Sequence, residues 1–441
     1  MKIPRTPPGL AEILKEPDQI MRIVTHEGIG PSQGKQYRHW EDLRRIQPPT
    51  GLSSEEWWAA VKLARRQTRR TIPLKDTNGN AFGYCLADPV LESLYEIDRN
   101  VSGRITTTDQ LLNPQTRDRY VMSSLIEEAI TSSQLEGAST TRDAAKQMIR
   151  SGRNPMNRSE RMILNNYRAI QRVKELTARP LTPKIVFTIH ETLIDGTLGE
   201  DDTGNHLRIP GDGVAVYHDG DGTLLHTPPP AREIARRMAA MCEFANKKQT
   251  DTFLHPILKA IILHFWLAYD HPFVDGNGRT ARALFYWSAL SQDFWMFEFL
   301  SISAVIRRSP TRYARSFLYT ETDENDLTYF LLAQLQVIRQ AIKALYAYLD
   351  KKALEIQSIE KILQSHASIN HRQLALLGHA LRHQGARYTI DTHKKTHRVT
   401  YQTARTDLLD LASRNLLVRT KTGQYFTFTA HADLAKRLKV S

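Results

Sequence analysis

The sequence predicts a mainly α-helical protein with a β-hairpin in its middle and a C-terminal winged helix domain. The first observation is that apolar residues recur at helical spacing through most of residues 84–340. The second is an interruption at Val214–His226, where two short apolar runs flank a glycine-containing turn. The predicted helical segments are Tyr120–Leu135, Met162–Val173, Ile185–Leu193, Ile234–Phe244, Ile257–Tyr269 and Ala281–Leu290.

Residues 1–83 are predicted to form an N-terminal extension to this helical domain. Ser53-Ser54-Glu55-Glu56 is typical of the start of a helix, because a serine cap and a glutamate three residues later can satisfy free backbone N–H groups. Thr71–Leu86 is predicted to be a hairpin with Asn78-Gly79 in its turn. The main domain then covers residues 84–340.

The remaining chain is predicted to be a linker helix (341–365) followed by a basic domain (366–441). Lys and Arg number 60 and Asp and Glu 47, a net charge of +13. Residues 366–441 hold 13 basic and four acidic residues, so +9 of this charge lies in the last domain. This concentration favours a polyanion as partner, although a solvated basic surface explains it equally well.

Composition excludes several classes of protein. Apolar residues make up 41% and charged residues 24% of the 441, which is typical of a folded globular chain. No apolar run approaches the roughly 18 residues that cross a bilayer, and the first residues do not form a signal peptide. Two cysteines are too few for a disulfide framework. We expect a cytoplasmic protein without membrane association.

The segment His271–Arg282 has the properties of an anion-binding loop. It follows one apolar helix and leads into the next, so its backbone N–H groups and the helix dipole favour negative charge. Gly276 and Gly278 allow close approach of a phosphate, and Arg279 and Arg282 add positive charge.

Two further residues give the loop a chemistry. Asp275 is an acid in a cationic loop, which is explained if Mg²⁺ lies between it and phosphates. His271 can act as a base near neutral pH. The adjacent Asp270 either raises the pKa of His271 or points away, and the sequence leaves both options open. Together these residues indicate phosphoryl or nucleotidyl transfer.

This loop resembles the signature of the Fic (Fido) family, enzymes that transfer AMP from ATP to a protein hydroxyl, and the resemblance covers about Tyr84–Leu335. It implies that His271 is the general base and that Asp275 holds Mg²⁺ against the phosphates. It implies an anion hole, an arginine for the γ-phosphate at Arg282, and a phenylalanine that packs the loop into the core. The nucleotide-binding residues so implied are Phe273, Gly276, Asn277, Gly278, Arg279 and Arg282.

The resemblance also assigns the hairpin and narrows the reaction. The hairpin would be a flap that clamps the target protein by strand pairing. Related phosphorylating enzymes of the Doc branch carry Ala-Asn-Lys where this chain has Gly276-Asn277-Gly278, which favours nucleotidyl transfer. The predicted docking residues of the flap are Val214, Val216, Tyr217, Leu224 and Leu225.

Ser132-Ser133-Gln134-Leu135-Glu136-Gly137 resembles the inhibitory motif of the same family, at the end of a predicted inhibitory helix (about 117–137). Ser132 and Glu136 are four residues apart and share one helix face. A carboxylate presented to Arg282 would form an ion pair and remove that arginine from the γ-phosphate. An ordinary helix end, or a glutamate that orients water to remove AMP, are the alternatives.

The C-terminal domain is predicted to contain three helices and a hairpin, the order of a winged helix-turn-helix. In that geometry the third helix, capped by Thr400, would enter the major groove of DNA. The candidate DNA contacts are Tyr401, Gln402, Arg405 and Lys421. Docking of a protein is the alternative role for such a domain.

Other single residues are predicted to be structural. His206, His226 and His264 have no acidic or cysteine partners at ligand spacing. Arg208, in a segment that leads to the hairpin, is also assigned no chemical role.

We therefore expect a protein adenylyltransferase that uses ATP and Mg²⁺, modifies a Ser, Thr or Tyr hydroxyl of a target protein, and is inhibited by Glu136. Transfer of another nucleotide or of phosphocholine, and removal of AMP, are alternatives on the same scaffold. A DNA-binding regulator that only senses nucleotide is an alternative of another class. The sequence does not decide between a monomer and a homodimer.

Overall fold

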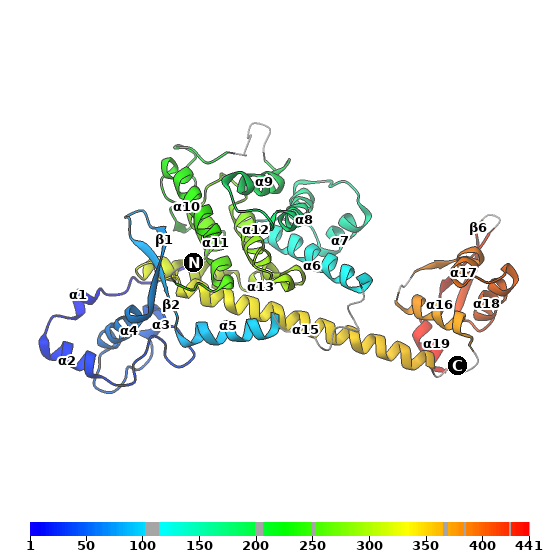
Figure 1. Ribbon diagram of the computed structural model, residues 1–441, viewed down its shortest axis with the longest axis horizontal. Helices are drawn as coiled ribbons and strands as arrows, with labels where there is room; N and C mark the ends of the chain where they lie inside the picture. The colour runs from blue at the N-terminus through cyan, green and yellow to red at the C-terminus, as the bar shows by residue number, and fades with distance from the viewer. Residues whose placement is uncertain are drawn as a thin grey trace. The chain divides into compact units, whose positions relative to one another are not determined.

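The computed structural model describes residues 1–101, 114–198, 206–247, 252–364, 369–382, 385–422 and 425–440. The chain divides into two compact units, Met1–Leu345 and Tyr346–Ser441 (Figure 1). The predicted extension and the predicted main domain thus lie in one unit. Within the described residues, no helix combines the length and apolar character that crossing a membrane requires.

The N-terminal region folds largely as its local sequence predicts. Helix α4 begins with Ser53 as its cap, and the side chains of Ser53 and Glu56 bond each other's backbone N–H in a capping box. Gly79 has a φ of +86° in the turn between strands β1 and β2. The elements are α1 (Leu10–Ile13), α2 (Pro17–Thr25), α3 (Trp40–Leu43), α4 (Ser54–Thr68), β1 (Arg69–Lys75) and β2 (Ala81–Cys85).

Buried polar contacts join this region to the helices that follow. Lys62 Nζ is 2.7 Å from Asp323 Oδ1, and both side chains are at most 5% exposed. The ring of His39 stacks on Tyr319 with centroids 4.3 Å apart, and Tyr319 donates a hydrogen bond to Asp42. Because a buried charge is costly without its partner, these contacts make residues 1–83 part of the first unit's core.

Every helix predicted from apolar periodicity between residues 120 and 290 is present. The helices are α5 (Asp88–Val101), α6 (Pro114–Leu135), α7 (Arg142–Ser151), α8 (Arg158–Leu176), α9 (Pro183–Ile194), α10 (Ile234–Asn246), α11 (Pro256–Asp270), α12 (Asn277–Leu290), α13 (Ile302–Ile306), α14 (Pro310–Thr322) and α15 (Thr328–Gln364), with short 3₁₀ turns η1 (Ala231–Glu233) and η2 (Trp295–Phe299).

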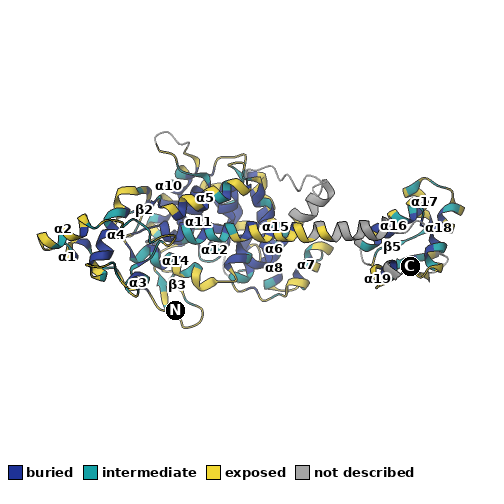
Figure 2. Cartoon of the chain, turned by 90° about the horizontal axis from the view of Figure 1, so that it is seen from below, coloured by how far each residue is buried: buried dark blue, intermediate teal, exposed yellow. Residues whose placement is uncertain are grey.

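Helices α11 and α12 form the centre of the first unit. Phe265, Trp266 and Phe285 on these helices are at most 1% exposed, and Figure 2 shows both helices largely in the colour of buried residues. A helix that is apolar on all sides belongs inside a protein, because burial of each large side chain contributes about 1.5–3 kcal/mol. The loop between these two helices is therefore held on both sides by the core.

The predicted hairpin is present but its strands are short. Strand β3 (Val216–Tyr217) pairs antiparallel with β4 (Leu224–His226), with Val216 opposite His226 and Tyr217 opposite Leu224. Gly222 has a φ of +65° in the connecting turn. Val214, which the prediction included in the first strand, lies before β3.

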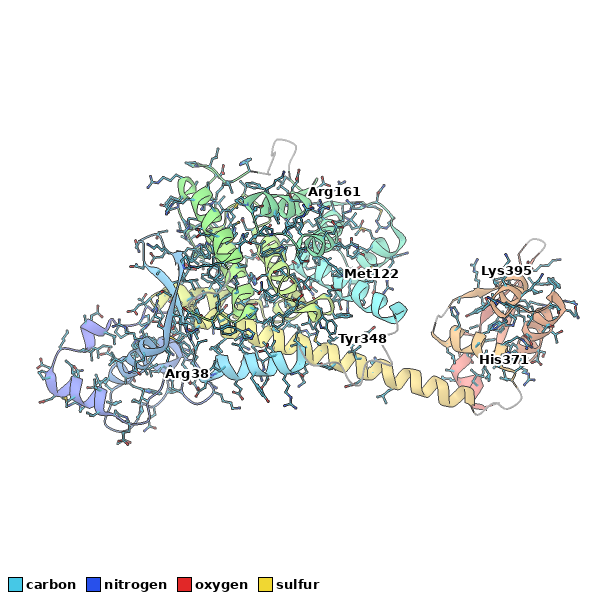
Figure 3. All side chains as sticks on the ribbon, viewed as in Figure 1. Arg38, Met122, Arg161, Tyr348, His371 and Lys395 are labelled. Atoms are coloured by element: carbon cyan, nitrogen blue, oxygen red, sulfur yellow. The ribbon has the colours of Figure 1, made fainter. Side chains whose placement is uncertain are left out.

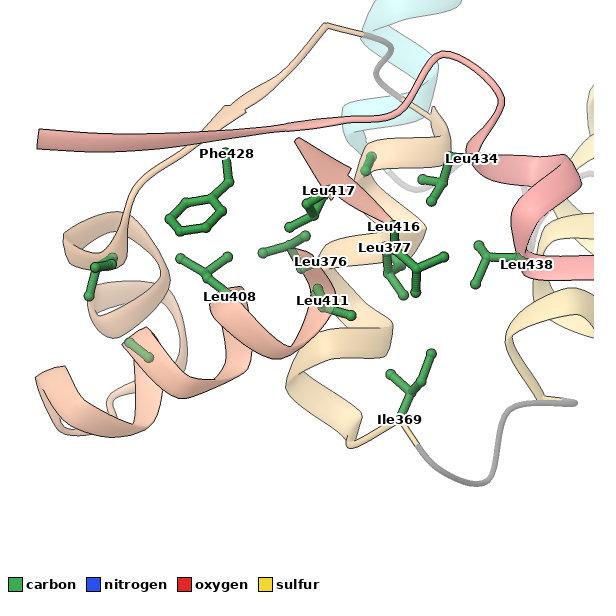
Figure 4. Close-up of a cluster of buried hydrophobic side chains, with 13 residues drawn as sticks. Ile369, Leu376, Leu377, Leu408, Leu411, Leu416, Leu417, Phe428, Leu434 and Leu438 are labelled. Carbon is green, nitrogen blue, oxygen red and sulfur yellow. The ribbon is translucent and has the colours of Figure 1, made fainter. Parts of the chain in front are cut away.

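The second unit has its own core and sheet. Its elements are α16 (His371–Arg382), β5 (Arg387–Tyr388), α17 (Ile390–His397), α18 (Tyr401–Ser413), β6 (Leu417–Thr422), β7 (Tyr425–Ala430) and α19 (Leu434–Val440), with strand order β5-β7-β6. Leu377, Leu408 and Phe428 are completely buried in this core (Figure 4). Strands β6 and β7 pair antiparallel as the predicted hairpin of this domain, and residues 423–424 between them lie outside the described residues.

Candidate active site

The loop between α11 and α12 begins and ends at residues with left-handed backbone conformations. His271 caps the end of α11 with φ 46° and ψ 58°, and Gly276 precedes α12 with φ 80°. A positive φ is uncommon for residues other than glycine and is found where the surrounding structure imposes it. The side chain of Asn277 closes the loop, because Oδ1 accepts a hydrogen bond from the N–H of Phe273 (2.9 Å) and Nδ2 donates one to its carbonyl (2.7 Å).

Phe273 fixes this loop to the core, and its side chain is 0% exposed. Its ring stacks on His190 of α9 with centroids 3.6 Å apart. His190 Nε2 is also 2.9 Å from the carbonyl oxygen of Asp275. The predicted contact of Phe273 with the nucleotide stays a prediction, and its buried ring packs the loop into the core. Its role is to position the loop, as the resemblance also implied, and His190 is a supporting residue that the sequence did not indicate.

The ring of His271 is oriented for proton transfer. Nδ1 lies 3.1 Å from the carbonyl oxygen of Ala268, and because a carbonyl only accepts hydrogen bonds, Nδ1 carries the hydrogen. Nε2 is thereby left as the basic nitrogen. Burial lowers the pKa of His271, and the charges of His226 and Arg208 lower it further against the opposing effects of the Ala268 carbonyl and Glu136. The imidazole is therefore neutral at pH 7.

Asp270 points away from His271. Its Oδ1 accepts a hydrogen bond from Arg237 Nε at 2.7 Å, and Oδ2 accepts one from the indole of Trp266 at 3.0 Å. Burial raises the pKa of Asp270 to about 6, with Arg237 and Trp266 opposing the rise. The sequence left open whether Asp270 raises the pKa of His271 or points away from it, and the structure shows that it points away.

Arg208, which was assigned no chemical role, holds the active-site loop by its backbone. Its Nε donates to the carbonyl of His271 (2.8 Å), and Nη2 donates to the carbonyls of Asp270 (3.2 Å) and Pro229. Its own N–H bonds the carbonyl of Pro272 at 2.9 Å. Arg208, which precedes the hairpin and lies 63 residues before His271, thus bonds the backbone of His271 and that of Pro229, which follows the hairpin.

Arg279 is a buried cation with donors still free. Its residue is 1% exposed, and Nη1 donates to the carbonyl of Leu193 at 2.9 Å. Nε and Nη2 have no hydrogen-bond partner in the described part of the chain, and Asp275 Oδ2 is 3.5 Å from Nη2. Leaving donors of a buried guanidinium without a partner is costly. An anion at the loop would satisfy them.

Arg282 is held by the predicted inhibitory motif. Its Nη2 is 2.8 Å from Glu136 Oε1 and donates to the carbonyl of Ser132 (3.0 Å), and its Nε donates to the hydroxyl of Ser132 (2.9 Å). Arg282 is 2% exposed and Glu136 28%. A methyl group placed on Gly278 would lie 2.2 Å from Glu136 Oε1. The carboxylate therefore occupies the face of the glycine loop where a phosphate would be expected.

One cavity of about 210 Å³ brings these groups together. Its wall includes His271, Gly278, Arg282 and Glu136, together with the hairpin residues Val216, Leu225 and His226. Tyr217 and Leu224, the other strand residues of the hairpin, are 56% and 45% exposed and form a cross-strand pair facing solvent. The remaining lining residues are Ala268, Tyr269, Tyr313, Ala314, Phe317, Leu318 and Glu321.

Asp275 is the residue in this loop suited to hold a metal ion. Its Oδ1 accepts the N–H of Gly276 at 2.6 Å, and Oδ2 lies 3.5 Å from Arg158 Nη2. The carboxylate is 33% exposed. In the described residues no three His, Cys, Asp or Glu side chains gather into a metal site. This arrangement fits Mg²⁺ held by one carboxylate and completed by phosphate and water, rather than by a protein cage.

The candidate DNA contacts lie on the surface of the second unit. Tyr401 is 51% exposed, and Gln402, Arg405 and Lys421 are exposed as well. Helix α18 begins at Tyr401 after the Thr400 cap, whose hydroxyl accepts the N–H of Thr403. Its other face carries buried Ala404, Leu408 and Leu411. Lys395 of α17, labelled in Figure 3, is exposed as well.

Comparison with known proteins assigns part of the chain. Residues 180–289 match the family model described as Fic/DOC family. "Protein adenylyltransferase Fic" of Nematostella vectensis is 44% identical over 59 residues, and the protein of that name from Drosophila melanogaster is 42% identical over 59 residues. Each match spans 13% of this chain, and 14% and 12% of the two relatives.

A solved structure extends the likeness of the fold. The crystal structure of a Fic family protein from Desulfovibrio desulfuricans G20 superposes with a TM-score of 0.54 at 19% identity, covering 79% of this chain and 98% of that one. The loop, the hairpin and Arg282 lie within residues 180–289, whereas Glu136 and the second unit lie outside them. Residues 180–289 therefore match the Fic/DOC family, and the chain spans only a small part of the length of the curated relatives it resembles.

Proposed function

We propose that this protein is an adenylyltransferase that moves AMP from ATP to a hydroxyl group of a target protein. The observation that carries the proposal is a single cavity lined by a neutral histidine, a glycine of the anion-binding loop and a buried arginine. Beside it, Arg279 has donors that lack a partner among the described residues. A base next to an unfilled anion site is the arrangement that phosphoryl and nucleotidyl transfer require.

In the proposed reaction His271 Nε2 accepts the proton of the attacking hydroxyl. The hydroxyl oxygen forms a bond to the α-phosphorus, the bond from that phosphorus to the bridging oxygen breaks, and pyrophosphate leaves. Arg279 and the N–H groups at the start of α12 would stabilise the negative charge on the phosphates. The hydrogen bond from Nδ1 to the carbonyl of Ala268, and the one from Arg208 to the carbonyl of His271, would keep the ring in place during transfer. Mg²⁺, held by Asp275, would neutralise phosphate charge when bound.

Glu136 would restrain this activity. The carboxylate pairs with Arg282 and covers Gly278, so a γ-phosphate and Glu136 would compete for one arginine. A bound ATP would then lie with its α-phosphate out of line with the hydroxyl. The same carboxylate could instead orient a water for removal of AMP, and its position near His271 in the cavity is compatible with that second reaction.

The experiment that tests the proposal compares nucleotides on the unrestrained protein. The Glu136→Gly variant is incubated in cell lysate with ATP, UTP, GTP or CTP labelled at the α-phosphate, or with labelled CDP-choline. Modified proteins are then identified by mass spectrometry. Label from ATP on protein hydroxyls, lost in the Glu136→Gly, His271→Ala double variant, supports adenylyl transfer. Preference for another donor, or label that survives loss of His271, would replace the proposal.

For the second unit we propose binding to duplex DNA through α18. The supporting observation is that Tyr401, Gln402 and Arg405 lie exposed on the first turns of α18, in a unit with a net charge of +9 between residues 366 and 441. Exposed residues near the start of a recognition helix are those that reach base edges.

This proposal is tested by titrating the full chain with fluorescent duplexes at several salt concentrations. Arg405→Ala should weaken binding severalfold. Arg414→Ala, which removes a cation already bonded to Asp410 3.0 Å away, serves as the matched control. Affinity should fall steeply with salt, because phosphate contacts release counterions. Binding that is absent, or insensitive to salt and to Arg405→Ala, would favour docking of a protein.

A further inference from the structure

His226, which the sequence analysis assigned no role, is bonded through both nitrogens of its ring. Nδ1 lies 2.8 Å from Glu321 Oε2 on α14, and Nε2 lies 2.8 Å from the carbonyl oxygen of Tyr269 near the end of α11. A carbonyl and an ionised carboxylate only accept hydrogen bonds, so each ring nitrogen carries a hydrogen. The ring is therefore an imidazolium, with one hydrogen on each nitrogen.

The surroundings of His226 favour this charged form. Its side chain is 9% exposed, and its ring lies 4.7 Å from the ring of Tyr269. The titratable and charged groups that face it are Glu321 from α14, with Tyr269, Asp270 and His271 from the end of α11. Burial opposes the charge, but the hydrogen bond and attraction of Glu321, the Tyr269 carbonyl and Asp270 together raise the pKa of His226.

The position of His226 links two parts of the site. It belongs to β4, directly opposite Val216 of β3, and both residues line the cavity. Its Tyr269 contact lies two residues before His271 in the chain. Leu225 of β4 also lines the cavity, whereas Tyr217 and Leu224 face solvent. Among these strand residues of the flap, His226 makes the charge-assisted contact to a helix of the core.

We propose that His226 is a positioning residue, which fastens the flap (Val214–His226) to the end of α11 and to α14 and whose charge adds to the burial that keeps the base His271 neutral. The first role follows from the two hydrogen bonds. The second follows from charge, because a cation in the wall of the same cavity disfavours a second cation on His271. The inference rests on the proposed function in assigning a reaction to this flap and base, whereas the two bonds exist independently of any reaction.

Hydrogen exchange of the flap amides, measured by mass spectrometry on the full chain without nucleotide, tests the fastening. His226→Gln and Glu321→Gln are compared with His206→Gln, a control at an exposed histidine before the hairpin whose ring lies 2.9 Å from the carbonyl oxygen of Leu207. We expect protection of peptides covering residues 214–226 to fall about tenfold or more in the first two variants, as for loss of one charge-assisted hydrogen bond. The control should keep wild-type protection.

The pH dependence separates the proton from simple packing. After correction for intrinsic exchange rates, wild-type protection should decline as pH rises through the pKa of His226, which lies above the ordinary value of 6.5, and the His226→Gln variant should show no such decline. Glu321→Gln should move the decline to lower pH. Unchanged protection in His226→Gln, or a decline that persists in it, would overturn the fastening role even if nucleotide transfer is confirmed.

Titration of His271 by NMR tests the second role. With the His226 charge removed, the pKa of His271 should rise, whereas an unchanged value would refute the electrostatic effect. Both experiments use protein without substrate. If both give the expected results but the protein transfers no group from any nucleotide donor, the proposed function fails and the role of His226 stands.

Discussion

Replacement of Glu136 by glycine should increase the proposed adenylyl transfer, because it removes the carboxylate that occupies two parts of the proposed phosphate site. The carboxylate bonds Arg282 Nη2 at 2.8 Å and lies against the free face of Gly278. Arg282 keeps its bonds to Ser132, so the arginine stays in place when the glutamate is lost. The freed donor then faces the cavity in which the nucleotide would bind.

The magnitude follows from the contact that is lost. A hydrogen bond to a charged group contributes about 1.5–3 kcal/mol when buried, and Glu136 is sufficiently buried for this range to apply. Since each 1.4 kcal/mol is a factor of ten in an equilibrium constant, the productive ATP complex should gain about 10- to 100-fold in population. The rate of label transfer should rise by the same factor.

The assay measures incorporation from α-labelled ATP into protein by wild type and variants, together with calorimetric binding of Mg-ATP. Glu136→Gln separates charge from bulk: it loses the ion pair but still covers Gly278, so its activation should be smaller than that of Glu136→Gly. Glu127→Gln on the same helix α6 removes a carboxylate that instead bonds Arg142, and should leave activity unchanged. Equal rates for wild type and Glu136→Gly would refute the reasoning.

Three further predictions concern the base and the parts of the chain that support it. The base must be neutral, and burial lowers the pKa of His271. In the Glu136→Gly form kcat/KM should therefore fall as the pH is lowered, with the midpoint of the fall below pH 6.5; a midpoint above pH 7 contradicts this. Arg208→Ala removes the donors that hold the active-site loop and should lower the free energy of unfolding by about 3 kcal/mol in denaturant titrations, and Arg208→Lys, which lacks the planar fork, should restore little of it. Burial lowers the pKa of His39 to about 4, so between about pH 6.5 and pH 4 His39 is protonated in the unfolded chain but not in the folded protein. The free energy of unfolding should therefore fall by about 2 kcal/mol between pH 7 and pH 5, and His39→Gln should remove this contribution.

The chemistry-bearing residues could be predicted because they are adjacent in sequence. His271, Asp275 and Arg282 lie in one loop and the first turns of one helix, so their proximity follows from local structure. Glu136 was placed against Arg282 by resemblance, since the ion pair joins residues 146 positions apart. The helices of the core were predictable for the physical reason that α11 and α12 are apolar over whole turns.

The supporting residues could not be predicted, because their partners are set by packing. Arg208 bonds backbone carbonyls, which every residue has, so no pattern of residue types marks the contact. Asp270 lies next to His271 in sequence, yet its direction depends on Arg237 from α10. His226 looks like an isolated histidine until the fold brings Glu321 beside it, 95 residues away.

Helix α14 connects the N-terminal region to the cavity. One side of α14 presents Phe317 and Glu321 to the cavity. Another side presents Tyr319, whose ring stacks on His39 and whose hydroxyl bonds Asp42. Because these contacts lie on one helix, we expect a change in its contacts with residues 39–42 to alter the position of Glu321, and through it of His226 and the flap. The region that carried least information as sequence thus supports one wall of the active-site cavity.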